Sequence, residues 1–187
     1  LYDLLPIMPP EAPGIDQKQL GKAPAEYRNG HWVLLKGWEV ARFTESQLAT
    51  HLASGANLGL RTARFPCVDI DCDHDAPAAA IRARVVALLG PAPCRHRVNS
   101  PRTALLFRTD APFKKIALPF TLPDGSKHKV EILCDGQQVV VAGRHKSGAT
   151  LEWDAEPFAG LLPELNEALA RDALAALRSE LAQNFGA

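Results

Sequence analysis

Acidic residues occupy every second position at the end of one apolar run in this chain. The run reads Val68-Asp69-Ile70-Asp71-Cys72-Asp73-His74-Asp75. In a β-strand, side chains two positions apart share a face, so Asp69 and Asp71 would present carboxylates about 6.5–7 Å apart at Cα. The apolar residues between them would be buried on the opposite face. The alternation therefore predicts a half-buried strand that carries two neighbouring carboxylates.

Carboxylate oxygens on such a strand are suited to a divalent cation. Mg²⁺ and Mn²⁺ prefer oxygen ligands and are mostly used to handle phosphates. A strand end whose acids face water is the simpler interpretation of an isolated D-x-D pattern. We expect Asp75 to cap a helix, because an Ala-Pro-Ala sequence follows it directly. Asp73 is left open between an outer position at the metal site and the turn into that helix.

A third carboxylate, Glu131, stands within the apolar run 130–133. A lone glutamate among apolar strand residues either faces water or packs beside Asp69 and Asp71. In the second case it would complete a ligand set for two metal ions about 3.5–4 Å apart, which activate a 3′-hydroxyl and neutralise a leaving pyrophosphate.

Charge is distributed unevenly along the chain, although the formal net charge is zero. Residues 95–129 contain eight Lys or Arg and two Asp or Glu residues, a net charge of +6. Residues 152–187 have a net charge of −5. Since local potential attracts a polyanion, the segment 95–129 is a candidate phosphate-binding surface. A solvated basic face without a partner is the alternative.

Size and hydrophobicity favour one globular unit. With 187 residues and 47% hydrophobic content, the chain can bury a sizeable core. We expect one domain over residues 1–160 and a helical appendage over 161–187. No apolar run approaches membrane-spanning length and no targeting pattern is found, so we expect a soluble cytoplasmic protein without a membrane partner.

Four cysteines lack the paired C-x-x-C spacing of a zinc ribbon. Buried, reduced thiols are the favoured interpretation. A zinc site is a less favoured alternative; it would draw on Cys67, Cys72, His74, Cys94 and His96.

Periodicity and turn residues predict the order of the elements. We expect an extended edge segment over 4–10, a short helix that Thr44 or Ser46 caps and Gly55 ends, and further helices over 77–89 and from about residue 163. The predicted strands are 57–62, 65–71, 104–108, 113–118, 127–134, 137–142 and 151–153. Asp135-Gly136 predicts a hairpin between 127–134 and 137–142. The last helix would turn one apolar face inward, formed by Leu165, Leu169, Ala173, Leu174, Leu177 and Leu181.

The order and spacing of several segments resemble one family. The segments are Gly21–Pro24, Asn57–Thr62, Val68–Asp71, Ser100–Arg108, Val130–Leu133, Gln137–His145 and Trp153. Together they are similar to the primase-polymerase domain of the archaeo-eukaryotic primase superfamily, as found in bifunctional primase-polymerase proteins of phages, plasmids and other mobile elements. The resemblance covers roughly residues 20–155.

This resemblance implies an α+β fold with a mixed-sheet core related to the RNA-recognition fold and helices packed behind it. The C-terminal helix predicted from periodicity would follow this core. It implies template-dependent nucleotidyl transfer, in which nucleoside triphosphates are joined on a single-stranded DNA template. It also implies that Asp69, Asp71 and Glu131 are the ligands of Mg²⁺ or Mn²⁺. A helicase domain or protein downstream is an expectation of the same kind.

One departure from the family concerns the strand over 100–108. The family usually has a Ser-Gly-Gly-x-His sequence whose histidine contacts the nucleotide's phosphates, and Ala104 stands at that position here. Since Ala104 cannot donate a hydrogen bond, we expect Arg102 to clamp the triphosphate. Further candidate nucleotide-binding residues are Ser100, Arg61, His145, Arg108 and Lys22. Ordinary surface charge, or a turn-stabilising role for His145, is the alternative for these residues.

Two other functions remain open. The chain would be a non-catalytic nucleic-acid-binding module if the loss of the histidine has ended polymerisation. Strand carboxylates also serve metal-dependent nucleases, but no lysine stands two positions after Glu131.

Overall fold

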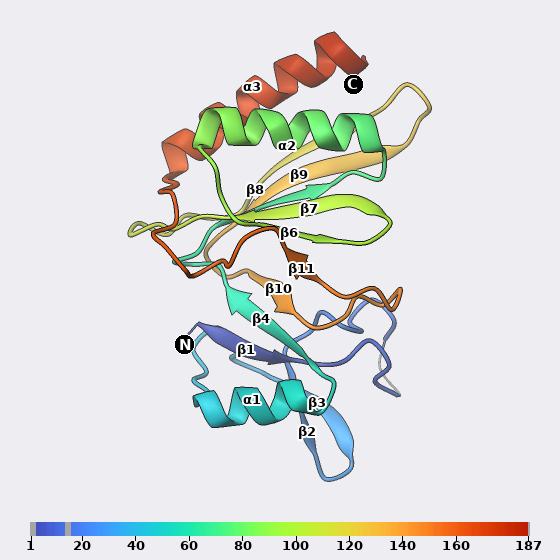
Figure 1. Cartoon of the computed structure of the whole chain (residues 1–187), viewed down its shortest axis with the longest axis vertical. Coiled ribbons are helices and arrows are strands. Elements are labelled where there is room, and N and C mark those ends of the chain that lie inside the picture. The colour runs from blue at the N-terminus through green and yellow to red at the C-terminus, as the bar shows by residue number, and fades with distance from the viewer. Residues whose placement is uncertain (1–2, 14–15, 187) are drawn as a thin grey trace. The chain divides into compact units, whose positions relative to one another are not determined.

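The structure, a computed structural model, describes residues 3–13 and 16–186. The chain divides into two compact units, each assembled from separate stretches of sequence (Figure 1). Unit 1 comprises Leu1–Thr62 and Gly136–Glu152, and unit 2 comprises Ala63–Asp135 and Trp153–Ala187.

Unit 2 is built on a six-stranded sheet in the order β11-β6-β7-β5-β9-β8. The strands are β5 (Cys67–Asp71), β6 (Cys94–Arg97), β7 (Ser100–Leu106), β8 (Ile116–Thr121), β9 (Lys127–Leu133) and β11 (Glu152–Trp153). The ladders that join β6, β7, β5, β9 and β8 in turn are all antiparallel. The α+β class is confirmed, whereas the expected mixing of strand directions is wrong for these five strands.

Two helices cover one face of this sheet, α2 (Asp75–Leu89) and α3 (Glu167–Phe185) (Figure 1). Val68 and Ile70 of β5 belong to the same buried cluster as Ile81 of α2 and Leu177 of α3. Because strand side chains alternate, Asp69 and Asp71 point to the opposite face. We call this face of β5, β6, β7 and β9 the acid face.

Unit 1 contains a three-stranded antiparallel sheet and a separate hairpin. In the sheet, β4 (Asn57–Arg61) lies between β1 (Leu4–Ile7) and β10 (Gln138–Ala142). The edge position expected for the proline-containing segment is thereby confirmed. The hairpin pairs β2 (Ala25–Arg28) with β3 (His31–Leu34).

Helix α1 (Glu45–Ala53) also belongs to unit 1 and begins where the sequence predicts. The Thr44 hydroxyl accepts from the Gln47 backbone N–H, and the Gln47 side chain accepts from the Thr44 backbone N–H. This reciprocal capping box satisfies two N–H groups that the first helical turn leaves unpaired.

The predicted hairpin around Asp135-Gly136 is wrong. β9 pairs with β5 and β8 in unit 2, whereas β10 pairs with β4 in unit 1. Gly136 does adopt a positive φ of 72°. The predicted turn at Gly136 is therefore confirmed. β9 cannot pair with β10, however, because β5 and β8 already occupy both of its edges.

The predicted helix cap at Asp75 is also wrong. Asp75 is the first residue of α2, and His74 holds the N-cap position without a side-chain hydrogen bond to the helix. Asp75 in the first turn still carries the negative charge that a helix N-terminus favours.

Helix α3 starts later than residue 163, because the Asn166 side chain accepts from the Leu169 N–H and caps it. Of the predicted inward face, Leu169 is 44% exposed and is therefore outside the core.

None of the helices among the described residues is long and apolar enough to cross a membrane.

Candidate active site

The three predicted carboxylates lie together on the acid face. In the register of β5 and β9, Asp69 is directly opposite Glu131, and Asp71 is opposite Lys129. Directly opposite residues place their Cβ atoms about 4.5–5.5 Å apart. Glu131 is 8% exposed, and both aspartates are partly buried. Two adjacent antiparallel strands thus bring together acids that are about 60 positions apart in the chain.

Glu131 is held by two lysines. Lys115 Nζ donates to its Oε1 atom at 3.0 Å, and Lys129 Nζ lies 2.6 Å from its Oε2 atom. Burial raises the pKa of Glu131, but the hydrogen bonds from Lys129 and Lys115 outweigh burial and leave the pKa below its ordinary value. The same contact with Glu131 raises the pKa of Lys129. Glu131 is therefore ionised and its charge is balanced by the protein itself.

Arg102 bridges two acids at the end of β5. Its Nε and Nη2 atoms donate to the two carboxylate oxygens of Asp73, both at 2.6 Å, and its Nη1 atom pairs with Asp71. The hydrogen bond from Arg102 lowers the pKa of Asp73, and that hydrogen bond also raises the pKa of Arg102. The sequence leaves Asp73 open between an outer position at the metal site and the turn into α2. Its contact with Arg102 shows that it positions this arginine next to Asp71.

Asp69 is the acid whose charge is least compensated. Burial is the main reason that its pKa is raised, and the negative charges of Asp71 and Glu131 raise it further. Arg95, which faces Ala104 across the β6–β7 ladder, opposes this shift. A cation bound beside these carboxylates would favour the ionised form of Asp69.

Basic side chains surround the acids on the same face of the sheet. Ala104 of β7 is the register partner of both Asp69 and Arg95, and Arg97 is the partner of Ser100. Because cross-strand partners share a face, Arg95 and Arg97 lie on the acid face. The sequence placed both arginines in the basic segment 95–129 but did not single them out as site residues.

The donor chemistry of the three carboxylates fits Mg²⁺ or Mn²⁺, since all their donor atoms are oxygens on one face of a sheet. Within the described part of the chain, however, no three His, Cys, Asp or Glu side chains are already grouped as a metal site. Arg102, Lys115 and Lys129 instead pair with carboxylate oxygens of Asp71 and Glu131. A metal ion would have to displace these cations.

The cysteines give no support to a zinc site. All four are buried and none forms a disulfide in the described chain. Burial raises the pKa of each of these thiols, for example that of Cys72. Without a bound metal, the thiol form of these side chains is therefore favoured over the thiolate.

The other predicted nucleotide-binding residues of unit 2 differ in their surroundings. Ser100 starts β7, and its hydroxyl accepts from the Arg102 backbone N–H at 3.4 Å. Arg108 follows the end of β7 and is bound by the segment before α3: its Nε donates to the Leu162 carbonyl at 3.1 Å and its Nη2 lies 3.2 Å from Glu164. Ser100 therefore stays next to the Arg102 clamp, whereas the contacts of Arg108 are structural.

Lys22, Arg61 and His145 belong to unit 1. Arg61 is 8% exposed and donates to backbone carbonyls of the segment 38–41. The His145 Nδ1 atom accepts from the Ser147 N–H within a turn, and Lys22 is exposed. A role of these three residues in nucleotide binding stays a prediction.

A comparison with family models identifies the family of this chain. The model described as the N-terminal domain of bifunctional DNA primase/polymerase, Prim-Pol, matches residues 2–168. The chain belongs to the Prim-Pol family. Membership supports DNA primase/polymerase-type nucleotidyl transfer at the level of the family, with DNA and nucleotides as substrates. No curated protein matches the chain.

Proposed function

We propose that this Prim-Pol domain is a template-dependent nucleotidyltransferase that joins nucleoside triphosphates on a single-stranded DNA template. The observation that carries the proposal is the acid face, where Asp69, Asp71 and Glu131 stand together among basic side chains. Paired strand carboxylates bind metal ions, and the surrounding cations suit a polyanionic substrate.

Asp69 and Asp71 would hold Mg²⁺ or Mn²⁺ in a two-metal arrangement, with Glu131 completing the ligand set. Such metals supply the activation of a 3′-hydroxyl and the neutralisation of a leaving pyrophosphate. The protein's own part would be to present three carboxyl side chains on one face and to release the contacts that Arg102, Lys115 and Lys129 make with Asp71 and Glu131. The released side chains of Arg102, Lys115 and Lys129 would then be available to the triphosphate.

An incorporation assay tests the proposal. Purified protein is incubated with Mn²⁺, nucleoside triphosphates and a single-stranded template, with and without a primer. We expect Asp71→Ala to abolish incorporation, because a metal ligand is lost, while the melting temperature stays close to that of the wild type. Asp172→Ala on the exposed side of α3 is the matched control and should be fully active. An Asp71→Ala protein that still starts or extends strands would overturn the proposal.

Arg102 tests the triphosphate clamp separately. Removing a charged hydrogen-bond partner costs about 1.5–3 kcal/mol, so Arg102→Ala should raise the KM for nucleotide by roughly tenfold or more. Arg171→Ala, which removes an exposed arginine paired with Glu167 on α3, should leave KM unchanged. If both variants behave alike, Arg102 does not bind the nucleotide.

A non-catalytic nucleic-acid-binding module is the second candidate, and a specific observation favours it. Ala104 beside Asp69 offers no hydrogen bond, and the carboxylates are already balanced by lysines and an arginine. Calorimetry with Mn²⁺ and a nucleoside triphosphate separates the two candidates. Salt-sensitive DNA binding without metal-dependent nucleotide binding would favour the module. Degradation of labelled DNA by metal alone would instead indicate a nuclease.

The wider context stays a proposal of the same kind. It comprises replication of a phage, plasmid or other mobile element, a helicase domain or protein as partner, and a cytoplasmic location. Co-purification of a helicase with the tagged protein from its host would test the partnership.

A further inference from the structure

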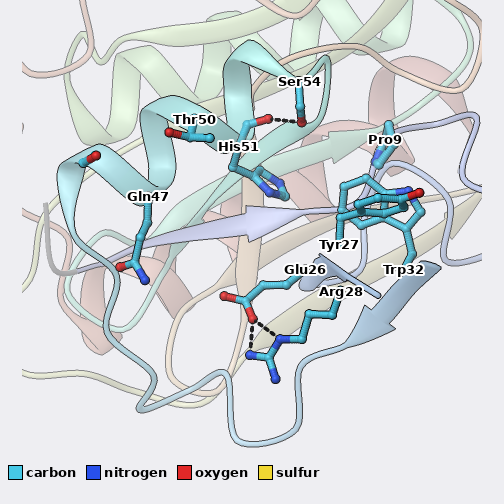
Figure 2. A pocket seen from close by; sticks show the side chains of 10 residues that line it. Pro9, Glu26, Tyr27, Arg28, Trp32, Gln47, Thr50, His51 and Ser54 are labelled. Atoms are coloured by element: carbon cyan, nitrogen blue, oxygen red, sulfur yellow. Dashed lines mark hydrogen bonds and ion pairs between the residues drawn. The ribbon is translucent and has the colours of Figure 1, made fainter. Parts of the chain in front are cut away.

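Unit 1 contains a groove that the proposed chemistry does not use. Its volume is about 750 Å³, and it is lined by residues of β2, β3 and α1 (Figure 2). This volume lies in the range of about 300–1,000 Å³ that is usual for small-molecule sites. We call it the aromatic groove, after Tyr27, Trp32 and His51, which line it.

The hairpin geometry explains why two large rings stand side by side. Tyr27 of β2 is the register partner of Trp32 of β3. The two residues of the turn, Asn29 and Gly30, have φ angles of 50° and 84°, as a tight I′-type hairpin requires. The ring centroids of Tyr27 and Trp32 are 5.4 Å apart, with an angle of 57° between the planes.

Neighbouring side chains hold the Trp32 ring in place, whereas the Tyr27 side chain is exposed to solvent. The rings of His51 and Trp32 are nearly perpendicular, with a centroid distance of 5.7 Å and an interplanar angle of 89°. His51 is itself held, because its Nε2 atom lies 2.9 Å from the Ile7 carbonyl oxygen. Trp32 also packs against the small buried cluster around Met8. Tyr27, by contrast, is 61% exposed. The fold thus holds one ring rigidly beside another that is open to solvent.

Helix α1 supplies a polar edge to the groove. Gln47, Thr50 and Ser54 line it from α1 and its C-cap (Figure 2). The Gln47 Oε1 atom already accepts from Thr44 N–H, so its NH₂ group is what it offers to a ligand. The Thr50 hydroxyl can donate or accept. An amide and a hydroxyl can form hydrogen bonds with ligands that differ in their donors and acceptors, so these groups do not select one particular ligand.

The lining is electrically neutral. Arg28 and Glu26 are its only Lys, Arg, Asp or Glu side chains among the described residues, and they pair with each other, with Nε and Oε2 at 2.8 Å. Because the lining carries no net charge, we expect it to bind a ligand mainly by contact with aromatic ring faces and less by attraction to phosphate groups. The ligand class that fits is therefore flat, aromatic and variable at its edges.

We infer that the aromatic groove stacks unpaired bases of single-stranded DNA on Tyr27 and Trp32. The inference rests on the proposed function, since a template-dependent enzyme must hold single-stranded DNA. Every base has a π-face, and each base stacked on an aromatic side chain contributes about 1–3 kcal/mol to binding. A proline-rich peptide also suits aromatic-lined grooves, but the family of this chain acts on DNA.

Fluorescence anisotropy with a labelled single-stranded oligothymidine tests the inference, in buffer with EDTA and without nucleotides. We expect Tyr27→Ala and Trp32→Ala each to weaken binding about 5- to 100-fold. Tyr27→Phe and Trp32→Phe, which keep a ring, should restore most of the affinity. Phe158→Ala removes another exposed ring, 49% exposed and in unit 2, and should bind as the wild type does. Thermal melts check that each variant is folded.

An abasic strand of the same length gives the decisive comparison. With the bases removed, Trp32→Ala should lose no affinity relative to the wild type. An equal loss on both strands would show that the tryptophan acts on fold or phosphates, and would overturn the inference. So would wild-type affinity of both alanine variants. Binding of a proline-rich peptide that depends on Trp32, with no effect on DNA, would assign the groove to a protein partner.

The assay contains neither metal nor nucleotide, so its result is independent of catalysis. If the ring variants bind DNA weakly while no protein incorporates nucleotides, the groove is supported and the proposed function fails. If instead the wild type incorporates nucleotides and the ring variants bind DNA normally, the proposed function stands and the role of the groove is overturned.

Discussion

Asp69 combines burial with two neighbouring carboxylates, and burial contributes most to its raised pKa. A group whose pKa is raised on folding contributes stability below its unfolded pKa and loses that contribution as the pH rises. At neutral pH the buried Asp69 carboxyl group therefore works against folding. Such a cost at a proposed metal-ligand position is typical of sites that are arranged for function.

Asp69→Asn should separate stability from activity. Because the amide replaces a buried carboxyl group whose ionisation is opposed by burial and by two neighbouring acids, we expect the free energy of unfolding at neutral pH to stay equal or to rise by about 1 kcal/mol. Nucleotide incorporation should be abolished. The difference in stability should shrink as the pH is lowered toward the ordinary aspartate value of 3.8. Urea unfolding at several pH values measures this, and a clear loss of stability at neutral pH would contradict it.

Glu131 shows the opposite linkage. Its pKa is lowered, so its contribution to stability is present above the ordinary glutamate value of 4.5 and is lost as the pH falls. Lys129→Gln removes one of its two partners and should reduce the free energy of unfolding at neutral pH by about 1 kcal/mol. We expect wild type and variant to converge in acid. Lys127→Gln, an exposed change on the same strand, is the control and should have little effect at either pH.

Residue alternation makes the acid face predictable, and it also predicts one of the lysines that pair with Glu131. Lys129 stands two positions before Glu131 on one strand, so both side chains must share a face. Lys115 and Arg95 were not predictable in this way, because their places depend on the register of β8 and β6. Register arises from tertiary pairing and is weakly marked in a single sequence.

At the level of elements, local signals predicted the start of α1 and most strands of unit 2, whereas the starts of α2 and α3 and some pairing partners were wrong. The capping box at Thr44 and the edge strand with Pro6 follow from side-chain and proline chemistry that acts within a few residues. The false hairpin at Asp135-Gly136 came from a correct turn signal. Whether two strands on either side of a turn pair depends on which other strands compete for their edges.

The junction between β4 and the end of β10 depends on one buried side chain. Asn57 is fully buried; its Nδ2 atom donates to the Gly21 and Arg144 carbonyls, and its Oδ1 atom accepts from the Arg144 N–H. Gly143, beside it, has a φ of 111°, and a Cβ atom there would collide with the Asn57 side chain. No other residue type fits this place without displacing the asparagine.

Gly143→Ala should therefore destabilise the protein by about 2–4 kcal/mol, since backbone strain adds to the loss of buried hydrogen bonds. Gly148→Ala is the matched control: its φ is 84°, but a Cβ atom would meet nothing within 4 Å. It should cost only about 1 kcal/mol. Guanidinium unfolding of both variants compares these losses, and equal values would show that the contact with Asn57 is unimportant.

At the scale of the whole chain, each unit combines two stretches that are separated in the sequence. The domain boundary expected near residue 160 rested on composition and stays a prediction. Helix α3 nevertheless contributes Leu174, Leu177 and Leu181 to the buried cluster that includes Val68 and Ile70 behind the acid face. Side chains of α3 thus help to pack the strand that carries Asp69 and Asp71.

Leu177→Ala tests this support. Leu177 is 1% exposed, and large-to-small changes in a core cost about 2–5 kcal/mol. We expect a loss in that range together with weaker incorporation at elevated temperature. Leu169→Ala on the same helix, 44% exposed, should change stability by less than about 0.5 kcal/mol. A small effect of Leu177→Ala would indicate that α3 is only loosely attached.

The central place of β4 between β1 and β10 has a consequence for biosynthesis. While the ribosome is still making residues 63–135, β4 has β1 as a neighbour but its other edge lacks a partner, because residues 138–142 do not yet exist. An open strand edge of this kind can pair with other chains. The nascent protein must therefore carry an unfinished sheet until residues 138–142 are made, and slow translation across 63–135 would lengthen the period in which it can aggregate or engage chaperones.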